Sequence, residues 1–263
     1  MSEAKVLYTL EEGIAILTMN SPANLNAIDV DMADELLNFL ERCENDPQVK
    51  VVVLRGSGKA FSAGGDIRYL YERINSGVTS DEKLVEYVGQ LALKIKRTGK
   101  LVITAVSGSA AGAGANLALS GDFCIATNRS RFIQSFVGIA LVPDTGGPYL
   151  LSRSIGAQRA LEMCITGRPV PAEEAYRLGL LYEVCEPEAL EERTMELARR
   201  LAAGPLLSYR KIKEQVYGAA FRDYEDYLKN VEETTMKVCA GSEDYFEGVR
   251  AFVEKRKPSF SGH

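Results

Sequence analysis

Histidine is almost missing from this sequence, since the only one, His263, is the last residue. Catalytic arrangements of the Ser-His-Asp or Cys-His type need a histidine inside the fold, so this lack argues strongly against them. A zinc site held by histidines is disfavoured for the same reason, and we expect no metal. Any acid–base chemistry must therefore use aspartate, glutamate, lysine, tyrosine or cysteine.

Cysteines are also few, and no CxxC pair occurs among Cys43, Cys124, Cys164, Cys185 and Cys239. An odd number at wide spacing is typical of reduced thiols, so we expect a cytoplasmic protein. No stretch reaches the roughly 20 apolar residues of a membrane span, and residues 1–10 lack the apolar run of a signal peptide. We therefore expect no membrane partner.

Positive charge is not in excess, because 31 lysines and arginines are outnumbered by 36 acidic residues, giving a net charge of −5. The basic residues are spread along the whole chain, which argues against a nucleic-acid partner. Hydrophobic residues make up 46% of the 263 positions, the balance of an ordinary globular protein.

Short apolar runs alternate with helical periodicity in the first half of the chain. Strands are predicted at 6–9, 14–19, 51–54, 101–106 and 123–126. Helices are predicted at 29–44, 81–97 and 115–120. Continuous apolar runs such as 51–54 are typical of strands buried on both faces, as in a parallel sheet. The pattern predicts an α/β fold with helical crossovers.

The alternation stops near residue 143, and the rest of the chain is mostly helical in pattern. Helices are predicted at about 156–165, 171–178, 187–204, 207–218, 221–238 and 243–254, with a small strand at 181–185. This change is compatible with two domains, or with one core and a helical layer used for subunit contacts. We place the boundary between a core at 1–200 and a helical region at 201–263.

Two glycine-rich segments, at 61–67 and 108–117, each follow a predicted strand. Loops at this position lie at the carboxyl edge of a parallel sheet, where ligands bind. Small side chains let a ligand approach the backbone, and the helix predicted to begin near Gly114 offers unpaired N–H groups. Both features favour an anionic oxygen. The alternative is that the glycines serve only tight turns and close packing.

With their surroundings, the two segments resemble the crotonase (enoyl-CoA hydratase/isomerase) superfamily, and the resemblance spans about residues 6–260. The supporting motifs are Leu25-Asn26-Ala27, Val142-Pro143-Asp144-Thr145-Gly146-Gly147, 161–168, 172–175 and 179–181. The resemblance implies a spiral of ββα units with a C-terminal helical region that forms homotrimers or dimers of trimers. It also implies an acyl-CoA thioester as substrate, with no cofactor because coenzyme A belongs to the substrate.

The resemblance further implies an oxyanion hole made by the backbone N–H groups of Gly65 and Ala113. Donors aimed at the thioester oxygen stabilise the enolate as it forms. An alanine at position 113 still supplies its N–H. The same family pattern makes Ala63 and Ile67 candidates for contacts with adenine. It also includes Gly112 among the substrate-binding positions.

Asp66 could be interpreted as a base, but the resemblance favours a structural role for it, in which its carboxylate orders the loop. We include it among the substrate-binding residues.

The acid–base residue is predicted from what the family positions hold here. Hydratases of the family use two glutamates to activate water, and Asn116 and Phe136 occupy those two positions. Asp144 stands where family isomerases have an aspartate. Its apolar surroundings favour a raised pKa, as a proton shuttle requires. The alternative is that Asp144 caps a helix or turn beginning at Thr145.

We therefore predict an enoyl-CoA isomerase in which Asp144 is the single acid and base. Asn116 is expected to orient a substrate group or to cap its own helix, and Phe136 to line the acyl pocket. Two other functions stay open at this point. One is a hydratase of atypical or dual function, and the other is a non-catalytic subunit that binds acyl-CoA.

Overall fold

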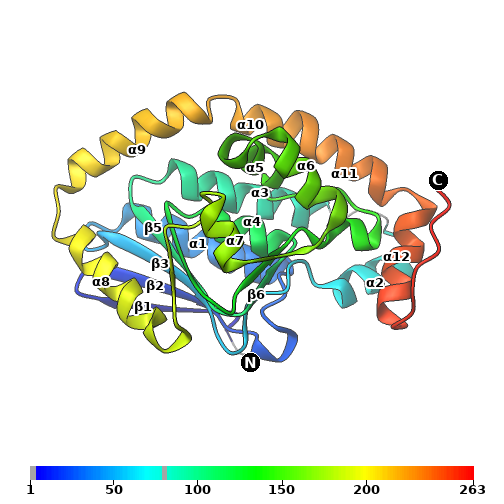
Figure 1. Cartoon of the computed structure of the whole chain (residues 1–263), viewed down its shortest axis with the longest axis horizontal. Coiled ribbons are helices and arrows are strands. Elements are labelled where there is room, and N and C mark those ends of the chain that lie inside the picture. Colours follow the sequence, from blue (N-terminus) through cyan, green and yellow to red (C-terminus); the bar gives the residue numbers. More distant parts are fainter. Residues whose placement is uncertain (1–3, 79–81) are drawn as a thin grey trace.

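The computed structural model describes residues 4–78 and 82–263, which form two β-sheets wrapped by helices (Figure 1). The larger sheet has six strands, in the order β1 (Val6–Glu11), β2 (Ile14–Met19), β3 (Val51–Gly56), β5 (Leu101–Val106), β7 (Phe123–Thr127) and β10 (Glu183–Cys185). Strands β1 and β2 are antiparallel, and all other neighbours are parallel. The predicted parallel sheet is confirmed.

The smaller sheet consists of β4 (Ala60–Ser62), β6 (Ser109–Ala111), β8 (Arg131–Ile133) and β9 (Pro169–Pro171). Each of β3, β5 and β7 is followed by a strand of this sheet and then by a helical segment. These segments are α2 (Ile67–Asn75), α4 (Ala113–Leu119) and a 3-10 turn at Ser135–Ile139. The repeat confirms the spiral of ββα units with a helical C-terminal region.

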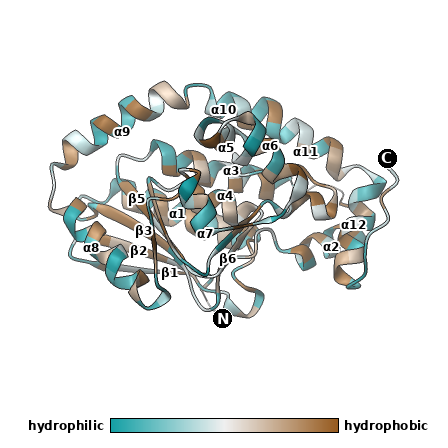
Figure 2. Ribbon diagram, viewed as in Figure 1, coloured by the Kyte–Doolittle hydropathy of each residue, from teal (hydrophilic) through white to brown (hydrophobic). Residues whose placement is uncertain are grey.

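The inner strands of the larger sheet are buried on both faces, which explains their continuous apolar runs. Val52 and Leu54 of β3 pack into the main core, beneath helices α1 (Val30–Asn45) and α3 (Glu82–Arg97). Val51 and Val53 point the other way, toward α8 (Leu190–Ala202). Figure 2 shows these strands as hydrophobic along most of their length. The first residue of the predicted helix 81–97 lies outside the described residues.

The remaining helices are α5 (Gly147–Ile155), α6 (Ala157–Thr166), α7 (Ala172–Arg177), α9 (Leu206–Ala220), α10 (Tyr224–Tyr227), α11 (Glu233–Ala240) and α12 (Glu243–Val253). Short helical turns lie at Pro22–Asn24 and Pro187–Ala189. Helix α5 was not predicted. The helix predicted at 221–238 is present as a continuous helical stretch over 224–240, in which a π-helical turn, Leu228–Glu232, lies between α10 and α11.

The C-terminal helices return to the core. Helix α9 runs along the outside of the molecule, α11 contacts α3, and α12 lies beside α2 (Figure 1). The boundary between 200 and 201 and a role in trimerisation stay predictions. Among the helices of the described part of the chain, none combines the length and apolar character needed to cross a membrane.

A buried ion pair fastens α9 to the residue that precedes β7. The Nζ atom of Lys213 lies 2.7 Å from an oxygen of Asp122, and both side chains are only 5% exposed. The same ammonium donates to the carbonyl oxygens of Ile95, at 2.8 Å, and Lys100, at 2.9 Å. All three ammonium protons therefore have acceptors.

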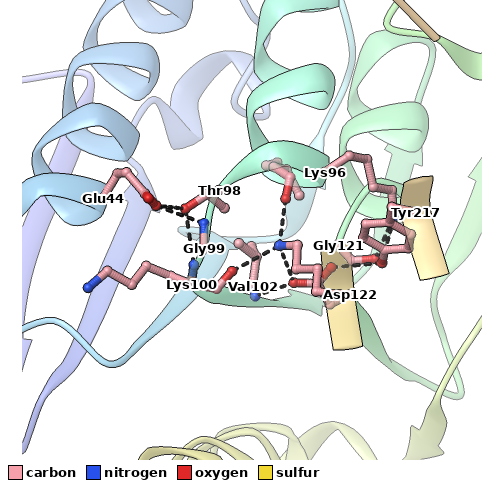
Figure 3. Close-up of polar contacts among 11 residues, drawn as sticks. Glu44, Lys96, Thr98, Gly99, Lys100, Val102, Gly121, Asp122 and Tyr217 are labelled. Carbon is pink, nitrogen blue, oxygen red and sulfur yellow. Dashed lines mark hydrogen bonds and ion pairs between the residues drawn. The ribbon is translucent and has the colours of Figure 1, made fainter. Parts of the chain in front are cut away.

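The Asp122 carboxylate is equally well matched (Figure 3). It accepts from the Val102 N–H and from the Tyr217 hydroxyl, each at 2.7 Å. Lys96 extends this hydrogen-bond network by donating to Tyr217 Oη and to the Gly121 carbonyl oxygen, each at 3.2 Å. Burial lowers the pKa of Lys96 to about 8. Helix α9 thus reaches the sheet through polar contacts.

Removing one partner of this pair should destabilise the protein strongly. Lys213→Met leaves Asp122 buried without its cation, which costs about 3–5 kcal/mol of unfolding free energy. Lys211→Met is the matched control, because Lys211 lies on the same helix in an exposed pair with Glu214 and should change stability little. Urea unfolding of both variants measures the difference. Equal stabilities for the two variants would contradict this account of α9.

Candidate active site

The two glycine-rich segments meet at one end of the smaller sheet, because β4 and β6 are parallel neighbours. Gly64 has φ +88°, and a Cβ there would lie 2.6 Å from the Ala111 carbonyl oxygen. Only glycine allows the segments to approach this closely. Asn26, from the Leu25-Asn26-Ala27 motif, supports the first segment by donating to the Ala60 carbonyl at 2.9 Å.

The backbone N–H groups of Gly65 and Ala113 are left without an acceptor within residues 4–78 and 82–263. Their neighbours are engaged, since Gly64 N donates to Ser62 Oγ at 3.1 Å and Asp66 N donates to the Ile28 carbonyl at 3.0 Å. Ala113 is the first residue of α4, one residue before the predicted start, so its N–H has no acceptor within the helix. Backbone N–H groups that are free to donate are the groups from which an oxyanion hole is built.

The predicted substrate-binding residues of the first segment lie around the same point. Asp66 caps α2, because its carboxylate accepts from the N–H groups of Arg68, at 2.9 Å, and Tyr69, at 3.2 Å. The Ala63 N–H is used inside the fold, donating to the Leu25 carbonyl at 2.9 Å. Any contact of Ala63 with adenine must therefore use its carbonyl oxygen. The binding roles themselves stay predictions.

A cavity of about 410 Å³ opens beside these segments. Its lining includes Ala63, Gly65, Ile67, Gly112, Phe136 and Asp144, all of which are predicted site residues. The rest of the wall is mostly apolar, with Leu70, Leu84, Val85, Ile139, Leu141, Met236, Ala240, Tyr245 and Phe252 among its side chains. Its size and lining suit a small apolar ligand group.

Asp144 is half-buried and faces this cavity. Burial raises the pKa of its carboxyl to about 6, although the Thr145 hydroxyl, donating at 2.7 Å, opposes the shift. Helix α5 begins only at Gly147, its N-cap is Gly146, and no side chain caps it. The alternative in which the Asp144 carboxyl caps a helix is therefore not what the structure shows.

The turn that presents Asp144 has an unusual backbone. Thr145 has φ +56°, which is a genuine outlier for a β-branched residue. Gly146 has φ +68°, and a Cβ there would lie 1.8 Å from the hydroxyl oxygen of Tyr224. Such conformations persist only where the surroundings enforce them, and they cluster at active sites.

Asn116 helps to enforce this turn. Its Nδ2 donates to the Asp144 carbonyl oxygen at 2.8 Å, and its Oδ1 accepts from Gln134 Nε2 at 2.7 Å. The side chain is fully buried, and both ends of its amide are engaged by protein. Phe136 is 7% exposed and lines the cavity. Asn116 and Phe136 occupy the two positions at which the resemblance places the glutamates of hydratases. Here the first is a buried amide with structural hydrogen bonds, and the second is an apolar side chain that lines the cavity.

The C-terminal contribution to the cavity was not predicted. Met236 and Ala240 come from α11, and Tyr245 and Phe252 come from α12. Helical periodicity indicates that one face of such segments is buried, but it does not indicate against what. In the described part of the chain, no group of three His, Cys, Asp or Glu side chains is placed to hold a metal ion.

Comparisons with known proteins agree with this geometry. The family model described as enoyl-CoA hydratase/isomerase matches residues 9–263. The chain is 38% identical to the trans-2-decenoyl-[acyl-carrier-protein] isomerase of Streptococcus mutans, with 100% of both chains covered. It is 34% identical to the 1,2-epoxyphenylacetyl-CoA isomerase of Escherichia coli, with 98% of both covered.

A solved structure shows the same fold. The chain superimposes on an enoyl-CoA hydratase from Mycobacterium avium subsp. paratuberculosis with a TM-score of 0.89 and 29% identity, covering 98% of this chain and 99% of that one. The chain therefore belongs to the enoyl-CoA hydratase/isomerase (crotonase) family, and it is an enzyme of that acyl-CoA-processing type.

Proposed function

We propose that this protein moves a carbon–carbon double bond along an enoyl thioester, with Asp144 as its single acid and base. The observation that carries the proposal is the lone Asp144 carboxyl, which faces an apolar cavity that Gly65 and Gly112 also line. An acid with a pKa near neutrality is well suited to accept a proton and to return it.

The reaction balances without a co-reactant. The Asp144 carboxylate takes a proton from the α-carbon of a 3-enoyl thioester, and the electron pair moves into a dienolate. The N–H groups of Gly65 and Ala113 stabilise its oxygen, each such donor lowering the barrier by roughly 3–4 kcal/mol. Protonated Asp144 then returns the proton to the γ-carbon, so that the double bond lies beside the carbonyl.

The Asn116 contacts support isomerisation over hydration. Hydration needs a base that holds and deprotonates a water, whereas both ends of the Asn116 amide are already bonded to Asp144 O and Gln134 Nε2. A hydratase of atypical or dual function has only Asp144 to do this work. Coenzyme A is the proposed carrier. The Streptococcus mutans relative is named for an acyl-carrier-protein thioester, so decenoyl-CoA and a decenoyl carrier protein should be assayed side by side.

The assembly as a homotrimer or dimer of trimers is part of the same proposal, as is a cytoplasmic location. Helix α9 exposes four large apolar side chains, Leu206, Leu207, Ile212 and Val216. Contact with neighbouring subunits would remove them from water.

Asp144→Asn should abolish isomerisation while leaving substrate binding intact. The amide keeps the shape of the side chain but does not act as a base, so kcat should fall roughly 10²- to 10⁴-fold. Titration calorimetry should show little change in acyl-CoA affinity. Asp226→Asn, at an exposed aspartate of α10, is the matched control and should be fully active. Robust isomerisation or hydration by Asp144→Asn would overturn the proposal, and wild-type binding without turnover would favour a non-catalytic subunit.

Isomerisation should decline as the pH falls through about 6. Burial raises the pKa of Asp144 to about 6, so the carboxylate that acts as base is present above this pH and protonated below it. The pH profile of kcat/KM reports this ionisation in the free enzyme. An acid limb near pH 4, where an ordinary aspartate titrates, would show that Asp144 is not in the predicted environment.

Met236 should limit the length of the acyl chain. Together with Val85 it lines both the apolar cavity and a second, polar cavity of about 380 Å³ on the other side. Met236→Ala removes part of this partition, so kcat/KM for a twelve-carbon over a six-carbon 3-enoyl-CoA should rise by about 10-fold. Met195→Ala, at a buried residue of α8, is the control for lost packing. An unchanged ratio, or an equal change in both variants, would contradict this role.

A further inference from the structure

Glu232 is an acid where an apolar residue is expected. It lies in the π-helical turn Leu228–Glu232 and is only 2% exposed. Leu228, Met236 and Ala240, which are four or eight residues away along the chain, are buried on the same side. Burying a carboxyl is costly unless its surroundings use it. π-Helical turns of this kind are frequent at functional sites.

The carboxyl of Glu232 reaches the turn that carries Asp144. Its Oε2 accepts the Gly146 N–H at 2.9 Å. Its other oxygen faces α3, where a Cβ at Gly89 would lie 3.8 Å from it. Tyr224 adds to the hold on the turn, because its hydroxyl donates to the Thr145 carbonyl at 3.4 Å. The strained residues Thr145 and Gly146 are therefore held by Glu232 and Tyr224 as well as by the contact of Asn116 with Asp144.

Among the described residues, the charged and titratable groups recorded as acting on Glu232 are acids and phenols. Asp144 lies on the turn, Tyr224 and Tyr227 come from α10, and Glu233 comes from α11. No lysine or arginine of the described residues pairs with Glu232. Burial raises the pKa of Glu232 well above its usual range, and the negative charge of Asp144 raises it further.

Two neighbouring buried carboxyls do not ionise independently. Asp144 faces the cavity, and its pKa is raised only to about 6, so it is the first of the two to lose its proton. The first negative charge of the pair is then located on the carboxyl that faces the substrate.

We propose that Glu232 is a positioning residue for Asp144. The Glu232 side chain stays protonated and holds the Thr145–Gly146 turn through its carboxyl carbonyl oxygen. The single negative charge of the pair is thereby left on Asp144. This inference rests on the proposed function of Asp144 as the base. It assigns the C-terminal helical region a part in the active site beyond lining the acyl pocket.

Two substitutions distinguish a role of the Glu232 side-chain oxygen as a hydrogen-bond acceptor from a role of negative charge on its carboxyl. Glu232→Gln keeps an acceptor for the Gly146 N–H and carries no charge, so kcat and the acid limb of kcat/KM should both stay close to wild type. Glu232→Ala removes the acceptor, so kcat should fall about 10-fold or more while KM changes little, because the base is misplaced. Glu225→Ala, at an exposed acid of α10, is the matched control. Melting curves of all three variants exclude loss of folding as the cause.

The protonation state of Glu232 is measured directly by infrared difference spectroscopy at neutral pH. Subtracting Glu232→Gln from wild type should reveal one carbonyl band of a protonated carboxylic acid. Absence of that band, or a downward shift of the acid limb by about one pH unit or more in Glu232→Gln, would show that Glu232 carries charge and would overturn the inference. Full kcat in Glu232→Ala would overturn the positioning role.

The infrared measurement needs no turnover. It therefore stays decisive even if Asp144→Asn remains active and the proposed function fails.

Discussion

The turn from Asp144 to Gly147 is the constraint on which the site depends. Thr145 and Gly146 both have positive φ angles, and the threonine is β-branched, a combination that costs on the order of 1–3 kcal/mol for such a residue. Asn116 holds the turn from α4 and Glu232 holds it from the π-helical turn. The Asp144 carboxyl is thereby presented to the cavity in one orientation.

The same turn explains why the C-terminal region cannot be separated from the chemistry. Glu232 lies 86 residues beyond Gly146 in sequence but hydrogen-bonds to it. Helix α9, fastened to the sheet through Lys213 and Asp122, leads the chain toward this position. The segment that runs from α9 to Glu232 therefore connects the packing of the outer helices to the position of the Asp144 turn.

Few groups carry the charge changes of the proposed reaction. In the proposed reaction, the backbone donors Gly65 and Ala113 stabilise negative charge on oxygen without any ionisable side chain. The single histidine lies at the chain end, so the proposed proton carrier is the Asp144 carboxyl, and burial moves its pKa close to neutrality. Asn116 and Phe136 supply no base, which supports the proposal of proton transfer between two carbons over addition of water.

The sequence predicts the larger sheet and the family well, because buried parallel strands are continuous apolar runs and the glycine motifs are specific. It misses the smaller sheet, since strands of three residues such as β4 leave no periodic signal. It also misses Glu232 and Met236, because helical periodicity does not say which distant loop a face will meet. The sequence did contain one signal for Glu232, because this acid lies at helical spacing among the apolar residues Leu228, Met236 and Ala240.

The central claim is that one enclosed carboxyl carries the proton from the α- to the γ-carbon. The most direct measurement is isomerisation of an α-deuterated 3-enoyl-CoA in ordinary water, with the product analysed by NMR. A single shuttling Asp144 predicts that part of the deuterium is retained at the γ-carbon of the same molecule. Complete replacement by solvent hydrogen, together with formation of a hydrated product, would contradict this account.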